Sequence, residues 1–508
     1  MRRKRNFIIF TTCLLVLLAC NAIFAQKNAA DKIAVARFEK NIEQGKFQET
    51  ERPLLDYAIA HPQDAKALEL LGRMRYLQNR LPEAKSLYTR AVALDANSVS
   101  AKIALGQIFA ESGQKDEARR ILFEAAQNPI NNSSLQLNLA RAFLFTGEPA
   151  KAIETAEKLP PAIKAADALP IIAAAYLESG KGEKLTDLLP LMKKAAISNP
   201  RLAAQCAEVL QNAAMNKEAV NLLRQTLAAA PNNFSILILL GKSEIAAKDF
   251  MQASQHLSQA AKLQPRSAQV FFAQALLAEA QGNSPAALQL LTRARQIEPN
   301  SAEILSQFVI SAMRVKQTRA AIDAAKILLE SKPDEPEYSY LLGAAFLQNG
   351  NIDAAQQNLQ RFVELRPADS RGCLALGLTL ASQPDKIGEA RAQLNHCLEI
   401  DVRNVEARYQ LGLSYKTQGE TAKAVEYLEE TVKQAPNYAS ALRDLGALYL
   451  QAGGETKARI VLEKAVALAP DDADTHFQLS RLYNLIGETA LAKQHLEIFQ
   501  KLKNSTVK

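Results

Sequence analysis

The chain has 508 residues, of which 48% are hydrophobic and 6% are aromatic, and it contains no tryptophan. This length and apolar content exclude a disordered chain, and the low aromatic share favours helices over strands. The formal net charge of +8 overstates the basic character, because half of it comes from Arg2, Arg3, Lys4 and Arg5. The composition therefore predicts an all-α protein. Elsewhere Lys and Arg are scattered evenly among Asp and Glu, so we do not expect the protein to bind nucleic acid.

Residues 1–25 predict a secretory signal peptide, because basic residues precede an apolar run that begins at Phe7. Cleavage after Ala25 is the favoured interpretation, since residues 22–25 continue the apolar stretch where a lipoprotein has a polar tether. Lipidation at Cys20, in the sequence LLAC, is the alternative. An uncleaved anchor helix is the third, because the run is just long enough to span a bilayer. The protein is therefore expected in the periplasm or cell envelope, with outer-membrane lipoprotein as the alternative and membrane contact only through this segment or a lipid anchor.

A period of 34 residues runs through the rest of the chain in three residue types. The prolines that follow it are Pro231, Pro265, Pro299, Pro333 and Pro367, and then Pro436 and Pro470. The alanines are Ala84, Ala118 and Ala152, then Ala219, Ala253, Ala287, Ala321 and Ala355, and after one additional residue Ala390, Ala424, Ala458 and Ala492. The glycine pairs are Gly72 and Gly106, Gly343 and Gly377, and Gly412 and Gly446. Such a period predicts an array of identical small structural units.

One unit, residues 441–472, predicts two antiparallel helices. The first has one apolar face at helical spacing, formed by Leu442, Leu445, Gly446 and Tyr449. Gly453 and Gly454 interrupt it, and the second helix has its own inner face of Ala458, Val461, Leu462 and Ala465. Pro470 ends the unit, because proline cannot continue the hydrogen-bond ladder of a helix. Each unit is therefore a helical hairpin.

These residues resemble the tetratricopeptide repeat (TPR) family. Its pattern of Leu-Gly, Tyr, turn Gly, small Ala, Leu and closing Pro is matched by Leu411, Gly412, Tyr415, Gly419, Ala424, Leu428 and Pro436. The usual Trp of the first helix is absent throughout. The resemblance covers nearly all of residues 31–505 and implies a right-handed superhelical α-solenoid of about fourteen helix-turn-helix repeats.

The repeats divide into two predicted arrays, about four over residues 31–161 and about nine over residues 201–505. Between them, residues 162–200 lose the alanine period, carry Leu185 where alanine is expected, and contain Pro170 and Pro190. This segment is interpreted as a degenerate repeat. It is either a bend between the arrays or a drifted repeat without a mechanical role.

Stacked hairpins create a concave wall from their first helices, which suits an extended peptide or a partner's helix. In the TPR family the fifth position of each repeat points toward that wall. Here it holds rings in every second unit, Phe272, Tyr340, Tyr409 and Phe477, with Arg443 in an intervening unit. The rings either form an aromatic ladder for peptide side chains or sugars, or fill space between adjacent helices. The Asn of the chaperone-type carboxylate clamp is absent.

The sequence contains no metal-binding or catalytic motif, since the five histidines are scattered and no cysteine pair has zinc spacing. We therefore expect no metal, no cofactor and no enzymatic activity. Cys373 and Cys397 fall near the start of one helix and the end of the next in a single hairpin. They form either a disulfide or two small core residues.

The sequence therefore predicts a protein-binding scaffold in the bacterial cell envelope, with other proteins as partners. It resembles the TPR components of secretion, pilus and polysaccharide-export machines. A structural or self-associating repeat protein is the alternative, followed by an enzyme or carbohydrate-binding module. The sequence does not predict the oligomeric state.

Overall fold

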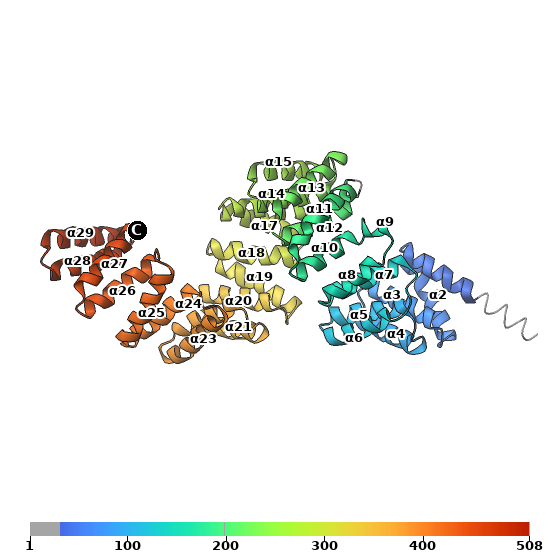
Figure 1. Ribbon diagram of the computed structural model, residues 1–508, viewed down its shortest axis with the longest axis horizontal. Coiled ribbons are helices and arrows are strands. Elements are labelled where there is room, and N and C mark those ends of the chain that lie inside the picture. The colour runs from blue at the N-terminus through green and yellow to red at the C-terminus, as the bar shows by residue number, and fades with distance from the viewer. Residues whose placement is uncertain (1–30, 198, 507–508) are drawn as a thin grey trace, which may run out of the picture. The chain divides into compact units, whose positions relative to one another are not determined.

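The computed structural model describes residues 31–197 and 199–506 (Figure 1). The predicted signal segment, with Cys20, lies outside the described residues. Within these ranges the chain is built from helices and short turns and contains no strand, which confirms the all-α prediction. None of the helices in these ranges is both long and apolar enough to cross a membrane.

The described residues form two compact units, which divide between Leu263 and Gln264. In the first unit, a helix over residues 31–43 precedes α2 (Phe47–Ala60), α3 (Ala65–Leu77), α4 (Leu81–Leu94), α5 (Val99–Glu111), α6 (Lys115–Ala126), α7 (Ser133–Phe145), α8 (Pro149–Glu157), α9 (Pro161–Lys164), α10 (Leu169–Glu178), α11 (Leu185–Ala196), α12 (Pro200–Asn212), α13 (Asn216–Ala229), α14 (Phe234–Ala246) and α15 (Phe250–Leu263). Apart from the short α9, the described helices of this unit pair into seven hairpins.

The second unit also contains seven hairpins among its described residues, coloured yellow-green to red in Figure 1. Its helices are α16 (Ala268–Ala280), α17 (Ser284–Ile297), α18 (Ala302–Arg314), α19 (Thr318–Ser331), α20 (Pro336–Gln348), α21 (Ile352–Leu365), α22 (Ser370–Ala381), α23 (Ile387–Ile400), α24 (Val405–Thr417), α25 (Thr421–Gln434), α26 (Ala439–Gln451), α27 (Glu455–Leu468), α28 (Ala473–Leu485) and α29 (Thr489–Thr506). Each unit is thus a stack of helix-turn-helix repeats, as predicted.

Several of the first helices begin at a side-chain cap, among them α3, α5, α7, α12, α14, α22, α24 and α28. The carboxylate of Asp64 accepts a hydrogen bond from the backbone N–H of Ala67 at 3.0 Å, and Asn233 caps α14 in the same way. Such caps satisfy amides that have no partner within the helix. They fix where these helices start.

The turns within the hairpins need a residue with positive φ, and this requirement repeats along the chain. Gly419 and Gly453 adopt φ values of 76° and 73°, which glycine reaches without strain. Lys248 and Lys316 take the same role with φ values of 62° and 60°. The turn therefore forms even where the sequence lacks glycine.

The alanines of the 34-residue period lie in the cores of the hairpins. From Ala84 to Ala458, every alanine of that series is fully buried. A larger side chain at these positions would push the two helices apart. The period is therefore set by helix packing.

Residues 162–200 continue the stack inside the first unit. Leu169 and Ala173 of α10 share one core with Leu185 of α11 and Leu202 of α12. Leu185, which stands where alanine was expected, is completely buried. The division between the two compact units falls at Leu263 and Gln264. A bend at residues 162–200 stays a prediction.

Candidate functional site

The four predicted ring positions of the second unit have different surroundings. Phe272 and Tyr409 are only 4% and 6% exposed, so they fill space between helices and do not belong to an exposed ladder. The half-buried Tyr340 packs on Phe362 with ring centroids 5.1 Å apart. Phe477 is 38% exposed and contacts Phe499. A binding role for the two rings that keep accessible surface stays a prediction.

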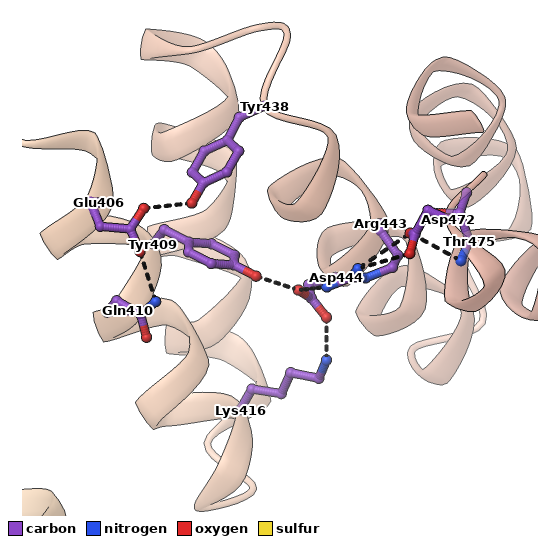
Figure 2. Close-up of polar contacts among 9 residues, drawn as sticks. All are labelled: Glu406, Tyr409, Gln410, Lys416, Tyr438, Arg443, Asp444, Asp472 and Thr475. Atoms are coloured by element: carbon purple, nitrogen blue, oxygen red, sulfur yellow. Dashed lines mark hydrogen bonds and ion pairs between the residues drawn. The ribbon is translucent and has the colours of Figure 1, made fainter. Parts of the chain in front are cut away.

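Tyr409 and Arg443, predicted separately, meet at Asp444 (Figure 2). The Tyr409 hydroxyl donates to Asp444 Oδ2 at 2.8 Å, and the Arg443 guanidinium donates to the same oxygen at 3.1 Å. Lys416 Nζ donates to Oδ1 at 2.6 Å. Burial raises the pKa of Tyr409 well above its ordinary value, and the Asp444 carboxylate raises it further. This hydroxyl therefore stays protonated and donating.

The same network continues along the first helices of three successive repeats, α24, α26 and α28. Arg443 also donates to Asp472 Oδ2 at 3.2 Å, and Asp472 caps α28 through the backbone N–H of Thr475. Beside it, the Tyr438 hydroxyl donates to Glu406 at 2.6 Å (Figure 2). These polar groups satisfy one another, so they fix neighbouring repeats together.

Cys373 and Cys397 are bonded as a disulfide in the structure, with their Cα atoms 5.6 Å apart. They join the start of α22 to the end of α23 and lie in a core with Leu394 and Leu411. The two alternatives from the sequence therefore coincide, because the pair is both buried and bonded.

The first unit carries a groove that the ring positions did not predict. It has a volume of about 610 Å³ and is lined by residues from four successive first helices and from the segments beside them. The lining residues are Glu39, Glu43, Lys66, Glu69, Arg73, Tyr76, Leu77, Tyr88, Ser100, Ile103, Ala104, Gln107, Asn132, Ser134, Leu135 and Asn138. A groove built across four repeats can hold an extended segment.

One end of this groove is charged, and its ions are paired. Lys66 Nζ lies 3.0 Å from a carboxylate oxygen of both Glu39 and Glu69. Burial, the largest single effect, lowers the pKa of Lys66, but the two carboxylates together raise it above its ordinary value. Arg73 lies 3.9 Å from Glu43. The lysine is therefore held as an ammonium ion.

The remainder of the groove is neutral and mixes apolar with amide side chains. Leu77 is 52% exposed, and Gln107 and Asn138 lie on the next two first helices. Amides can both donate to and accept from a peptide backbone. The sequence contained a signal for the charged end of this groove. Lys66, Glu69 and Arg73 occupy the second, fifth and ninth positions of α3.

Models of the tetratricopeptide repeat match residues 42–99, 238–302, 307–370 and 409–473, and further models of the same repeat match 75–129 and 133–158. The chain belongs to the tetratricopeptide repeat family. The matches together cover more than half of the chain. Since TPR arrays present extended surfaces for other proteins, this chain is a protein–protein interaction scaffold.

Among solved structures, this TPR chain is similar to one described as the crystal structure of the APC/C hetero-tetramer Cut9-Hcn1. The two are 14% identical with a TM-score of 0.43, over 88% of this chain and 95% of the other. A comparison with curated proteins finds no match.

Proposed function

We propose that this TPR protein is an exported scaffold that holds a segment of a partner protein in the groove of its first unit. The observation that supports this proposal is the groove itself, because residues from four consecutive first helices and their flanking segments line a single cavity. The second unit contributes a contrast. There, the polar side chains around Asp444 are bonded to one another and offer fewer free groups to a ligand.

The occupant that fits best is an extended or helical peptide segment with both apolar and hydrogen-bonding groups. Leu77 offers exposed apolar surface, while Gln107 and Asn138 offer amides. A lining of this kind recognises backbone and side-chain groups together. We propose no catalytic role for this groove.

The proposed setting is the cell envelope, reached through the predicted signal segment of residues 1–25, or anchored through Cys20. Assembly of a secretion, pilus or polysaccharide-export machine would use a scaffold of this kind. Cell fractionation tests this setting. Recovery of the full-length chain only in the cytosolic fraction would contradict it.

Affinity capture from an envelope fraction at moderate salt tests the groove. We expect the wild-type chain to retain a distinct second protein, and Leu77→Asp or Gln107→Arg to lose it, because each places a charge in the groove. The matched control is Leu94→Asp, at a 40% exposed position on α4 outside the lining. Retention of the partner by both groove variants would contradict the proposal.

Self-association is the second candidate, since solenoid ends expose faces that inner repeats cover. Ile33 and Ile59 of the first hairpin are 71% and 69% exposed. Capture of the chain alone, with a mass above that of a monomer by light scattering, would favour this candidate over a separate partner.

A further inference from the structure

The last described helix, α29, exposes a position that is buried in the second helices before it. The residue four positions after the alanine of the period is Leu394 in α23, Leu428 in α25 and Leu462 in α27, and all three are completely buried. The equivalent residue of α29 is Leu496, which is 39% exposed. Ala492, the alanine of the period in α29, also keeps some exposed surface. One face of α29, at the red end of Figure 1, is therefore uncovered.

In the preceding hairpins, the first helix of the next hairpin covers this position. Leu462 of α27 lies in one core with Leu479 of α28, and Leu428 of α25 lies in one core with Leu445 of α26. In both pairs the covering leucine stands 17 residues after the leucine that it covers. Among the described residues no first helix follows α29. A helix that covered Leu496 in the same way would need an apolar side chain at the position of these covering leucines.

A polar contact between successive hairpins also lacks its partner in α29. The residue directly after the alanine of the period is basic in five second helices. In four of them it binds an acceptor that stands just before the second helix of the next hairpin. These pairs are Lys85 with Gln114 at 2.6 Å, Arg119 with Glu148 at 3.1 Å, Arg391 with Glu420 at 2.8 Å and Arg459 with Glu488 at 2.8 Å. The fifth is the exposed Lys493 of α29, which has no ion-pair partner within the described part of the chain.

The charge of α29 favours an acidic occupant. The helix carries three lysines and one glutamate. Lys503 binds Asp474 of α28 at 3.3 Å. Lys493 lies one turn before Leu496, in the register from which Arg459 reaches the following hairpin. We call the surface formed by Ala492, Lys493 and Leu496 the α29 face. An apolar centre flanked by an ammonium group is complementary to an amphipathic helix that carries carboxylates.

A second copy of this chain does not supply these groups. In a head-to-tail stack, the helix over residues 31–43 of one copy would cover α29 of the other. Arg37 stands one period before Leu71, in the register of the covering leucines, so it would bring a guanidinium against Leu496. Lys46 stands where Glu488 stands in the last hairpin, so it would face Lys493 with a like charge. These two side chains oppose stacking between copies.

We propose that the α29 face docks an acidic amphipathic helix of a different protein, in the place that a following first helix would take. An apolar side chain of this helix packs on Leu496, and a carboxylate binds Lys493. The required spacing is that of α28, where Leu479 and Glu488 are nine residues apart. This site shares no residue with the groove of the first unit, so it provides the scaffold with a second binding surface.

Fluorescence anisotropy with the full-length chain and a labelled synthetic peptide tests the site. The peptide has the sequence of residues 473–490, because this segment contains α28, which covers α27 in the structure. A side-chain staple between positions 477 and 481, both exposed in α28, keeps the peptide helical. We expect saturable binding to the wild-type chain. Leu496→Asp should weaken it by at least about tenfold, because a charge replaces the apolar contact.

Exchange of charges tests the polar contact separately. Lys493→Glu should weaken binding by about fivefold, and a peptide with Glu488→Lys should restore it, because opposite charges again face each other. The matched control is Lys464→Glu at an exposed position of α27 outside the α29 face, which should bind the original peptide as the wild type does. Circular dichroism should show the same helix content in all three variants of the chain.

A peptide of residues 31–48, with the staple in the same register, represents a second copy and should not bind. Light scattering should give the same mass for the wild type and Leu496→Asp. Four results would overturn the proposal: no saturable binding of the 473–490 peptide, equal binding by Leu496→Asp, no restoration by the exchanged charges, or binding of the 31–48 peptide as tight as that of the first. A mass that Leu496→Asp lowers would also overturn it, because the occupant would then be a second copy.

Discussion

Gly446 of α26 lies directly against Leu462 of α27, so that a Cβ added to the glycine would be 2.5 Å from Leu462 Cγ. The same relationship recurs at Gly412 and Leu428 of the preceding hairpin, where that distance would be 3.0 Å. In both hairpins the two residues are sixteen apart in the chain. The glycine thus sets how closely the helices of one hairpin approach.

Gly446→Ala should lower the free energy of unfolding by about 1–3 kcal/mol, although alanine is the better helix former. The reason is the contact with Leu462, which leaves no room for a methyl group. The control is Gly388→Ala in α23, where a Cβ would meet nothing within 4 Å and stability should rise by up to ~1 kcal/mol. Urea denaturation measures both. Equal effects of the two substitutions would contradict the packing explanation.

Lys316→Gly should raise the free energy of unfolding by about 1 kcal/mol, because Lys316 has a φ of 60°, a region that favours glycine. The exposed turn loses a side chain without losing a core contact. Gly453→Ala, at a turn with φ 73° and open space around its Cβ position, should have the opposite sign. Melting temperatures of the two variants check the prediction, which fails if both shift in the same direction.

Asp444→Asn should lower the free energy of unfolding by about 2 kcal/mol, because Arg443 and Lys416 lose a buried, charged acceptor. Tyr409→Phe should cost about 1 kcal/mol through its lost hydrogen bond. A double-mutant cycle should give a coupling of about 1 kcal/mol between the two.

The control for this cycle is Asp334→Asn, since the Asp334 side chain is 93% exposed in its ion pair with Arg361. This substitution should change stability by less than about 0.5 kcal/mol. Additive effects of the Tyr409 and Asp444 substitutions would show that their hydrogen bond does not stabilise the contact between repeats.

Alkylation followed by peptide mapping should find the Cys373 and Cys397 peptides linked and Cys206 free. In the native protein Cys206 should react slowly, because it is buried and burial raises the pKa of its thiol to about 12. Reduction of the disulfide, which spans 24 residues, should cost about 3 kcal/mol. Alkylation of Cys373 and Cys397 without reductant would contradict the bond.

Much of the fold could be predicted because the same helical hairpin repeats along the chain. Ala424 and Ala458 are fully buried as their period implies, and Gly419 and Gly453 turn the chain where the motif places them. The exceptions are instructive. Lys316 adopts a glycine-like φ of 60° at a turn where the sequence has no glycine.

The candidate site was harder to predict, because exposure depends on which residues of other repeats cover a position. Tyr409 and Phe477 share one position in the motif, yet Tyr409 is buried and Phe477 keeps accessible surface. Motif position alone cannot distinguish them. The groove around Lys66 also emerged only from the stacking of several first helices.

The sequence by itself determined the family, the helical hairpins, their boundaries and the small residues at their closest contacts, because these follow from spacing within 34 residues. The tertiary structure alone decided which faces stay open and where the polar groups around Asp444 pair. The physical reason is the distance along the chain over which each property is determined. Helix spacing is a local property of the chain, whereas burial and pairing depend on side chains that packing brings together from different helices.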